Sequence, residues 1–508
     1  MKRKLMSLTL CAAMVLTSAA MLASCAEQAK TTTAAPNNNV EPNKAMSKIP
    51  EGLNFHDLDE EDRILTVAYT EGSNGPYTQR SLKADELDEA DVDVATRARD
   101  ALLKEKFGLE LELVSTGNSI QSMREYVKTS LAAGNGDYDI LAGFQYYSIS
   151  LAADGYLLNL NDLANPNINA DYIDLDAPYW GKAFNDNMSY QGAYYWISGD
   201  LALRYIGGMY CTFVNATIYN EKLSNYGNIY TIAKEGKWTL DLMIEMASKC
   251  YEDNGDTPGK QDPGDTFGYA YEPGTDIPDA IALGAGAQFT YRDPATGEIS
   301  VTLNNQRTFD VSKKIKALSK TGDYSYQYSN ADNATVMTAY AGGNIAFVVN
   351  KLFQAESYLS EMEDDYYIIP VAKFDENQTN YITGIHDGCT IFGIPYDTDK
   401  VAQAAVALEF LCYYSSENVA PLYFEGALKG RYTRDPDAAS MIDLLHNSVT
   451  TDFGIAWGNS IKNIPHVFRD CEPLNASIIG RRVSEWQKAL DELTDKLVQY
   501  VHGGEDAE

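Results

Sequence analysis

The sequence predicts an α/β protein with more than one domain, and three observations lead to this prediction. In the first part of the chain, strand patterns alternate with amphipathic helix patterns, as in a parallel sheet covered by helices. A later region, after residue 300, shows further helix and strand patterns. About 450 residues follow a polar N-terminal segment, which is enough for two or more domains.

The first elements follow one another from residue 64. Residues 64–69, ILTVAY, predict a short apolar strand, and residues 94–107 have a helical periodicity that stops at a glycine. Residues 109–114, LELELV, alternate as a half-buried strand does. A helix over 119–133 and a third strand, YDILAGF, complete a strand-helix-strand-helix-strand order that favours a parallel sheet.

The middle of the chain has a different character. Residues 190–219 form an aromatic run that we expect to be strand-like, and Thr239 is a suitable N-cap for the helix after it. The remaining patterns predict helices at 307–320, 333–341, 400–414 and 482–501, and strands at 345–349, 366–370 and GCTIFGIP.

The N-terminus has the layout of a secretory signal: three basic residues, an apolar run to Leu22, and small residues before Cys25. Polar residues interrupt that run and no basic cluster follows it, so a membrane-spanning helix is the weaker interpretation. Leu-Ala-Ser-Cys resembles the bacterial lipobox, which implies a signal peptide over 1–24 and a lipid on Cys25. Residues 25–58 are polar and rich in Pro and Asn, and they predict a flexible stalk.

The composition limits the partners. A formal net charge of −32 repels nucleic acid and anionic lipid headgroups, but it says little about a neutral ligand. Five cysteines follow the stalk and none are in Cys-x-x-Cys spacing. The five are Cys211, Cys250, Cys389, Cys412 and Cys471. We expect most of them to be buried and to pack as small hydrophobic residues, and one disulfide between distant cysteines remains open.

Several segments, taken together in their order, resemble the extracellular sugar-binding proteins of ABC importers, the maltose-binding-protein-like group. They include YDILAG with DGYLLNLNDL, GMYCTFVNATIY with KWTLDLMIEMASK, AGGNIAFVVNKLF, and GIPYDTDKVAQAAVALEFLCYYS. The resemblance implies a two-lobe periplasmic-binding-protein-like fold with crossing hinge strands and an interlobe ligand cleft. It places 59–205 with 368–428 in the first lobe, and 206–367 with 429–508 in the second.

The same resemblance implies a function. The protein would capture a carbohydrate, an oligosaccharide, and deliver it to ABC transporter permease subunits without catalysis or a cofactor. It would act as a monomer, anchored by lipid to the outer face of the bacterial cytoplasmic membrane. Three alternatives remain: a secreted carbohydrate-active enzyme, a surface protein that holds glycans, and an importer component for a peptide or another non-sugar solute.

A sugar needs aromatic platforms for its apolar face and polar side chains for its hydroxyls. Ligands of parallel sheets sit beyond the carboxyl ends of the strands, and other candidates flank the expected crossings. On these grounds we expect ligand-binding residues at Glu71, Asn74, Gln145, Tyr146, Trp196, Asp200 and Asp387.

The family resemblance adds further candidates. Where maltose-type proteins carry Asn-Gly-Pro-Trp, this chain has Asn350-Lys351-Leu352-Phe353, so Phe353 takes the stacking position without the Gly-Pro turn. Trp457 has glycines on both sides, and maltose-type proteins carry a tryptophan that stacks on sugar in the comparable region. The resemblance therefore implies that Trp457 stacks on the ligand. Trp238 and Trp486 are predicted to be core residues.

Motifs for catalysis and metal binding are missing from the sequence. It has no Gly-x-Ser-x-Gly, Ser-x-x-Lys, His-Glu-x-x-His or Walker-type motif. The five histidines lack metal-ligand spacing. The acidic loop 253–265 departs from the EF-hand pattern, and a solvated loop is the favoured interpretation over a calcium site.

Overall fold

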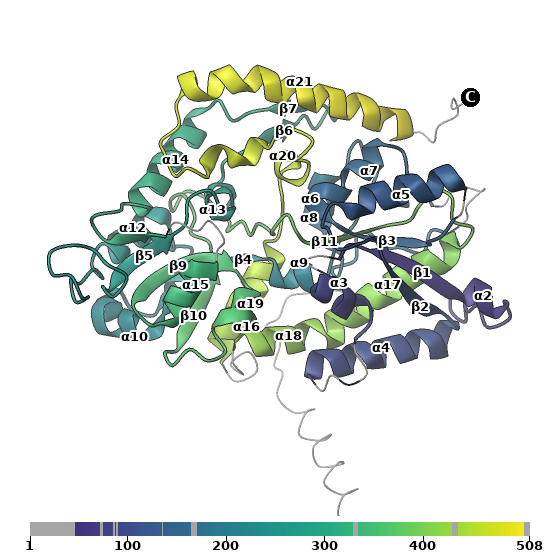
Figure 1. Ribbon diagram of the computed structural model, residues 1–508, viewed down its shortest axis with the longest axis horizontal. Coiled ribbons are helices and arrows are strands. Elements are labelled where there is room, and N and C mark those ends of the chain that lie inside the picture. Colours follow the sequence, from purple (N-terminus) through teal and green to yellow (C-terminus); the bar gives the residue numbers. More distant parts are fainter. Residues whose placement is uncertain are drawn as a thin grey trace, which may run out of the picture. The chain divides into compact units, whose positions relative to one another are not determined.

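A computed structural model describes residues 46–71, 75–84, 87, 90–134, 136–163, 170–328, 334–428 and 435–501. Its elements build on two main sheets, which we use to define two lobes (Figure 1). Among the described helices, none is both long enough and apolar enough to cross a membrane. The lipid-bearing residue expected at Cys25 and the stalk up to residue 45 lie outside the described residues.

The first lobe contains a four-stranded sheet in the order β11-β3-β1-β2. The strands β1 (Ile64–Tyr69), β2 (Glu110–Ser115) and β3 (Ile140–Phe144) are parallel, as the sequence predicts, and β11 (Thr390–Gly393) is antiparallel to β3. Strand β3 is buried along its whole length because helices cover both faces of such a sheet.

Helices α4 (Asp91–Phe107) and α5 (Ser122–Ala133) lie beside this sheet, close to the predicted ranges. Each ends at a glycine in the left-handed region, Gly108 and Gly134, whose N–H bonds back to the last turn. Helix α17 (Val401–Asn418) packs on α4.

The second lobe contains a five-stranded mixed sheet in the order β10-β4-β9-β5-β8. The strands at β9 and β10 and the helices at α14 and α15 confirm the predictions for this region. The bounds are β4 (Tyr210–Asn215), β5 (Phe267–Tyr271), β8 (Ser325–Gln327), β9 (Ile345–Lys351), β10 (Tyr366–Pro370), α14 (Gln306–Leu318) and α15 (Ala334–Ala341).

Two predictions about the second lobe's core are confirmed. Thr239 caps α12 (Leu240–Ala247) by accepting from Leu242 N at 3.3 Å. Trp238 is fully buried, packs on Phe347, and donates from Nε1 to Pro370 O at 3.0 Å.

Shorter elements connect and cover the sheets. In chain order they are α2 (Glu60–Arg63), α3 (Gly75–Leu82), α6 (Gln145–Ser148), α7 (Ser150–Ala153), η2 (Leu160–Asp162), α8 (Lys182–Met188), α9 (Leu203–Gly207), α10 (Ala216–Ile218), η3 (Tyr219–Leu223), η4 (Ser224–Tyr226), α11 (Ile229–Lys234), α13 (Ile277–Gly284), β6 (Thr290–Arg292), β7 (Ile299–Val301), α16 (Gln354–Tyr358), α18 (Ala420–Ala427), α19 (Pro436–Asn447), α20 (Phe453–Ala456), η5 (Ile464–Phe468) and α21 (Ala476–Val501).

The expected strand-like run over 190–219 is wrong for most of its length. Only Tyr210–Asn215 pairs as a regular strand, and the residues before it form isolated bridges and the short helix α9. Bulky side chains such as Tyr195 and Trp196 are nevertheless buried there. A high strand propensity reflects a fit to half-buried surfaces, and here irregular backbone offers that environment.

The chain passes between the lobes near residues 208 and 385. There Met209 and Ile385 form an antiparallel bridge, and His386 N donates to Gly208 O at 3.0 Å. The lobe boundary expected at residue 368 falls inside β10, whose pairing with β4 keeps it in the second sheet. The return to the first lobe therefore comes after Pro370.

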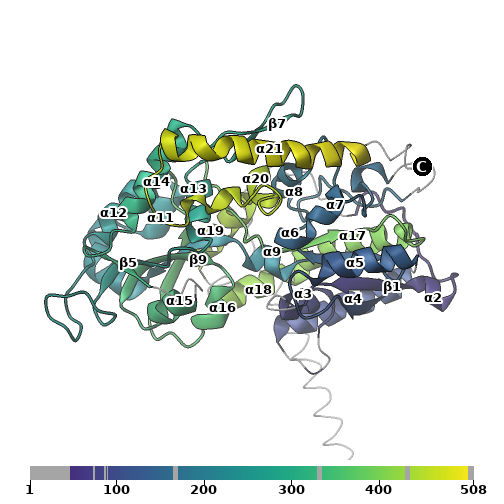
Figure 2. The ribbon, with the colours of Figure 1, turned by 45° about the horizontal axis from the view of Figure 1, so that its top comes forward.

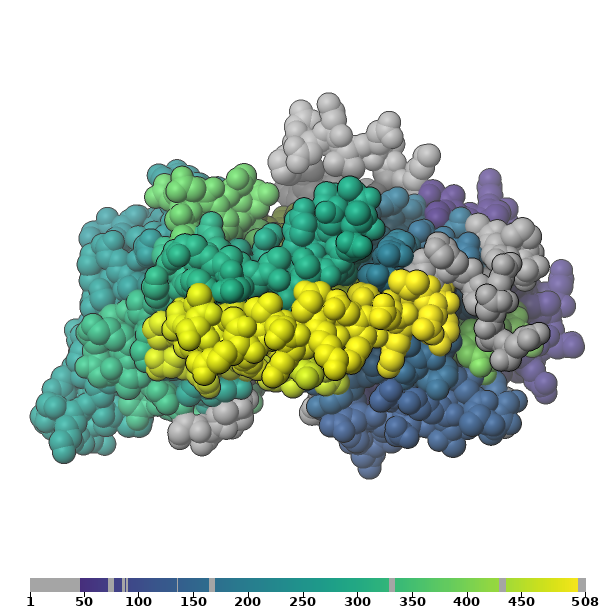
Figure 3. Space-filling model, turned by 90° about the horizontal axis from the view of Figure 1, so that it is seen from above, coloured from purple at the N-terminus to yellow at the C-terminus, as the bar shows by residue number. Residues whose placement is uncertain are grey.

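The long C-terminal helix α21 contacts both lobes (Figures 1 and 2). On the second lobe, Gln487 Oε1 accepts from Val301 N at 2.8 Å. On the first lobe, the ring of Tyr500 lies against Gly155, where an added Cβ would stand 2.4 Å from the ring. Figure 3 shows the helix in yellow, running from teal-green segments to blue ones. Trp486 in this helix is buried, as expected.

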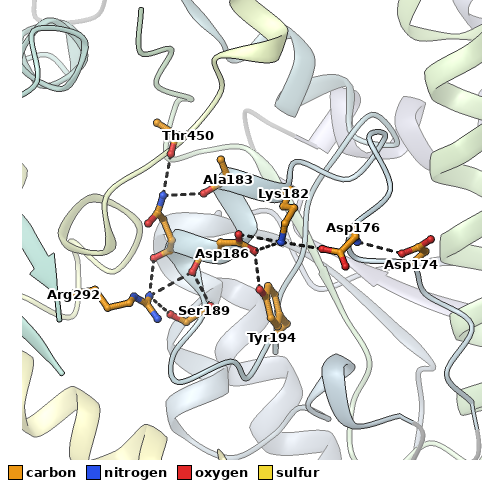
Figure 4. A network of polar contacts seen from close by, with 10 residues as sticks. Asp174, Asp176, Lys182, Ala183, Asp186, Ser189, Tyr194, Arg292 and Thr450 are labelled. Carbon is orange, nitrogen blue, oxygen red and sulfur yellow. Dashed lines mark hydrogen bonds and ion pairs between the residues drawn. The ribbon is translucent and has the colours of Figure 1, made fainter. Parts of the chain in front are cut away.

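A polar network around α8 makes a further connection between the lobes (Figure 4). Arg292 of β6 donates to the carbonyl oxygen of Ser189 just beyond α8, where a helix end carries partial negative charge. Asn187 Nδ2 donates to Thr450 Oγ1 at 3.0 Å. On the same helix, Asp186 accepts from Lys182 at 3.1 Å and from Tyr194 Oη at 2.7 Å.

The cysteines follow the expectation from sequence. All five cysteines within the described residues are buried free thiols. In the loop 253–265, the carboxylates accept from backbone N–H groups, for example Asp265 Oδ1 from Gly255 N at 2.8 Å. The described residues contain no cluster of side chains that could hold a metal ion.

Candidate functional site

A small cavity lies where elements of the two lobes meet. The space open to water measures about 30 Å³, which is room for about two water molecules. Its walls come from α6 and the return segment at 384–387 on one side, and from β4, α13 and η5 on the other. They are Tyr146, Tyr210, Asp276, Asp279, Ala280, Leu283, Gly384, Ile385, Asp387, Ile455, Pro465, His466 and Arg469.

Asp276 is the centre of a buried polar cluster at the edge of this cavity. Its carboxylate accepts from Lys351 Nζ at 2.9 Å, from the Tyr210 hydroxyl, and lies 3.3 Å from His386 Nε2. Burial alone would raise the pKa of Asp276, but the Lys351 ammonium, His386 and the Tyr210 hydroxyl together outweigh burial and hold that pKa well below its usual range.

His386 is neutral at physiological pH, because burial, followed by the charge of Lys351, lowers its pKa to about 3. Its Nδ1 accepts from Gly388 N at 3.1 Å, so the ring proton lies on Nε2 and faces Asp276.

Two further carboxylates, Asp279 and Asp387, line the cavity. Arg469 Nε donates to Asp279 Oδ2 at 2.7 Å, whereas Asp279 Oδ1 is buried and has no hydrogen-bond partner among the described residues. Asp387 Oδ1 lies 3.7 Å from His386 Nε2, beyond hydrogen-bond distance. Burial and then the charge of Asp276 raise the pKa of Asp387 to about 6.

The two walls touch each other directly across the cavity. The Tyr146 hydroxyl donates to Asn463 Oδ1, and Gln145 Nε2 donates to Ala456 O at 3.4 Å. Gln145 is itself fixed on the first lobe, where its Oε1 accepts from Cys389 Sγ at 3.0 Å. The arrangement is therefore a narrow polar interface between two α/β lobes.

Comparison with known proteins assigns the family. The family model for bacterial extracellular solute-binding proteins matches residues 94–420, which is more than half of the chain. The chain belongs to this family. The match confirms the resemblance and the α/β fold class drawn from the sequence.

Solved structures share the fold of this solute-binding protein at low sequence identity. UgpB from Mycobacterium tuberculosis in complex with glycerophosphocholine is 12% identical, with a TM-score of 0.53 over 85% of this chain and 98% of that one. A cyclo/maltodextrin-binding protein complexed with maltotetraose is 12% identical, with a TM-score of 0.51 over 87% and 98%. A search of curated proteins by sequence finds no match.

Among the residues expected to bind ligand, Tyr146 and Asp387 line the cavity of this solute-binding protein, and Gln145 lies just behind Tyr146. Glu71 is half-buried and accepts from Ser115 Oγ, and it is not part of the cavity wall. Asn74 lies outside the described residues.

The other candidates lie away from the cavity: Trp196, Asn350 and Trp457 are buried in packing contacts, and Asp200 lines a separate pocket beside His446. Trp196 Nε1 donates to Ile149 O at 3.3 Å, and Asp200 accepts from His446 Nε2 at 2.7 Å. Trp457 stacks on Phe453 and donates to Met188 O at 2.9 Å. Asn350 is fully buried within β9. Ligand binding by these four residues stays a prediction.

Phe353 lies at the lobe boundary, but a protein side chain already occupies its ring face. The guanidinium carbon of Arg204 stands 4.1 Å from the centroid of Phe353 and 4.1 Å from that of Tyr77. Phe353 lies two residues beyond β9 and Tyr77 lies in α3, so the two rings belong to different lobes.

Sequence reasoning missed the charged residues that define the cavity, among them Asp276, Asp279, Lys351 and Arg469. One signal was present: Asp276 and Asp279 stand three residues apart at the start of a helix, which puts both carboxylates on one turn. Their partners, Lys351 and Arg469, come from elements far along the chain, and the local sequence does not predict these pairs.

Proposed function

We propose that this protein is the substrate-binding component of an ABC importer, that it captures a carbohydrate between its lobes, and that it delivers it to membrane permease subunits. The observation that carries the proposal is Asp279 Oδ1, an acceptor at the cavity that is buried without a hydrogen-bond partner among the described residues, with the Asp387 carboxylate lining the same cavity. Sugar hydroxyls supply donors of the required kind. The maltotetraose complex of a protein with the same fold supports this choice of ligand.

Ligand entry requires the lobes to separate. The cavity holds about 30 Å³, whereas pockets for small ligands measure about 300 Å³ or more. A ligand that contacts both walls would replace the direct contacts of Tyr146 and Gln145 across the cavity. Such a ligand binds the closed arrangement, in which both lobes contact it, more tightly than the open one. This difference in affinity shifts the hinge equilibrium toward the closed arrangement.

The remaining parts of the proposal concern location and chemistry. The lipobox-like segment supports a lipid anchor on Cys25 at the outer face of the bacterial cytoplasmic membrane, and a tether raises the local concentration near a permease. Intact mass of protein from a membrane fraction tests the anchor, and an unacylated Cys25 contradicts it. The protein acts as a monomer and does not cleave its ligand.

Calorimetric titration of the purified protein with a panel of neutral and acidic oligosaccharides, combined with product analysis, tests the function. Asp387→Asn should weaken the binding of the best ligand about tenfold to a hundredfold, because it removes a charged hydrogen-bond acceptor. Asp470→Asn is the matched control, since Asp470 is an exposed carboxylate outside the cavity. Glycan cleavage, or no binding across the panel, contradicts the proposal.

A further inference from the structure

Arg204 in α9 is a buried cation that forms no ion pair among the described residues, and Glu356, whose charge acts on it, pairs directly with Arg80 instead. Its side chain is largely enclosed, with the residue 6% exposed, and Nε has no hydrogen-bond acceptor. Other buried cations differ: Arg469 and Lys351 each pair with a carboxylate, and Arg99 donates to two carbonyls, a hydroxyl and a carboxylate.

The aromatic rings beside Arg204 do not replace an anionic partner. The guanidinium lies over Tyr77 and Phe353, whose rings belong to different lobes. Cation–π contacts attract the charge, but they do not supply an oxygen acceptor in the guanidinium plane, and Nε remains without one among the described residues. Burial accordingly lowers the pKa of Arg204. A charge held in this way is costly unless a further group binds it.

The nearby acids are already engaged elsewhere. Arg80 binds Asp93 at 2.7 Å and Glu356 at 3.1 Å, so these carboxylates face another guanidinium. A second donor at the same place is also unsatisfied: the Tyr423 hydroxyl is buried without a partner. It lies against Gly207, where an added Cβ would stand 2.2 Å from the hydroxyl and 3.2 Å from Phe353 Cβ.

The end of β9 links the surroundings of Arg204 to those of the cavity. Lys351 reaches Asp276 at the cavity, and Phe353, two residues later, contacts Arg204. Helices α3 and α9, which carry Tyr77 and Arg204, lie side by side (Figures 1 and 2). One end of the interface therefore offers acceptors for hydroxyls, and the other offers donors that need an oxyanion.

We propose that Arg204 binds an acidic group of the ligand, and that the captured carbohydrate is an acidic saccharide containing uronic acid. This inference rests on the proposed function. A guanidinium fork matches the two oxygens of a carboxylate, and hydroxyls of the saccharide would supply donors to Asp279 and Asp387. The negative net charge does not forbid such a ligand, because salt screens surface charges beyond about 8 Å.

Calorimetry with charge-matched ligands tests the inference on the purified full chain. The probes are oligomers of galacturonate, glucuronate and mannuronate, each compared with its methyl ester or neutral hexose counterpart. We expect at least one uronate oligomer to bind about tenfold to a hundredfold more tightly than its neutral counterpart. Arg204→Met should abolish this preference, and Arg204→Lys should retain part of it.

Sulfated and phosphorylated sugars form a separate arm. If a sulfated or phosphorylated sugar binds more tightly than the uronate oligomers, and Arg204→Met removes that preference, Arg204 binds an acidic group, and this group is a sulfate or phosphate ester. Binding of neutral saccharides without any acidic preference overturns the inference and leaves the proposed function standing. No binding by either class overturns both.

A ligand-free measurement gives an independent check. Arg204→Met removes a buried charge without an anionic partner, so the melting temperature should stay unchanged or rise. The matched variant Arg469→Met leaves Asp279 buried without its cation and should lower the melting temperature. An equal loss in both variants would show that Arg204 has a structural role and would overturn the inference.

Discussion

Replacing Lys351 by methionine should destabilise the protein by about 3 kcal/mol, near the lower end of the range for breaking a buried ion pair. The side chains of Lys351 and Asp276 are 4% and 12% exposed, and Nζ lies 2.9 Å from Oδ1. The loss stays near the lower end because Tyr210 and His386 still face Asp276. For a lobe of this size, the change corresponds to a fall in melting temperature of roughly 6–12 °C.

The effect should depend on pH with a defined sign. In the native protein the depressed pKa of Asp276 contributes stability above the pKa of the unfolded state, and this contribution is lost as pH falls. Without Lys351 the carboxyl group can protonate, so the variant and the parent should differ less at about pH 4 than at about pH 7.

Urea denaturation followed by tryptophan fluorescence measures the change. The double variant Lys351→Met/Asp276→Asn should recover most of the loss, because it removes the stranded charge. Lys316→Met is the control, since Lys316 pairs with Glu472 on the surface and should change stability by less than about 1 kcal/mol. A loss in Lys351→Met no larger than in this control, or no recovery in the double variant, would refute the reasoning.

Three further predictions concern titration and buried donors. Burial opposes protonation of His446, but Asp200 and then Asp443 outweigh it and raise its pKa, so the pair contributes stability below about pH 6.5 that is lost as pH rises. His446→Ala should therefore lower the melting temperature more at about pH 5.5 than at about pH 8.5. Glu409→Ala strands the Tyr179 hydroxyl and Trp180 Nε1 and should cost about 3 kcal/mol or more in denaturation, while Glu409→Gln should cost less. Carbohydrate affinity should fall as pH drops through about 6, where Asp387 protonates, and Asp387→Asn should flatten this dependence in calorimetry.

Local patterns predicted the first sheet well. Ile64–Tyr69 and the helix that ends at Gly108 have their periodicity and their stop signal within a few residues. Strand β5, Phe267–Tyr271, gave no such signal, because it is buried on both faces and short, and its pairing partners β9 and β8 lie far along the chain. The range of β10 was predicted, but its place in the second lobe depends on its pairing with β4, which the sequence alone does not reveal.

The site could be predicted only where backbone geometry controls it. The rule that ligands sit beyond strand ends led to Tyr146, which follows β3, and Asp387 precedes β11. Aromatic content gave weaker guidance, since Trp457 is a typical large side chain that the fold buries. The segment LALRYIGG gave no sign that Arg204 is unusual, because its importance comes from the absence of a hydrogen-bond acceptor for Nε among the described residues.

The contacts between the lobes determine how large a difference in affinity a ligand needs in order to shift the equilibrium between the separated and the closed lobes. Across the cavity, the hydrogen bonds of Tyr146 and Gln145 each contribute about 0.5–1.5 kcal/mol, so separating the walls costs only a few kcal/mol there. Helix α21 contacts both lobes outside the cavity, and its buried apolar side chains add to what holds them together. A ligand can shift the equilibrium only by its difference in affinity for the two arrangements. Contacts to Asp279 and Asp387 from opposite walls supply such a difference, because both form only when the walls approach.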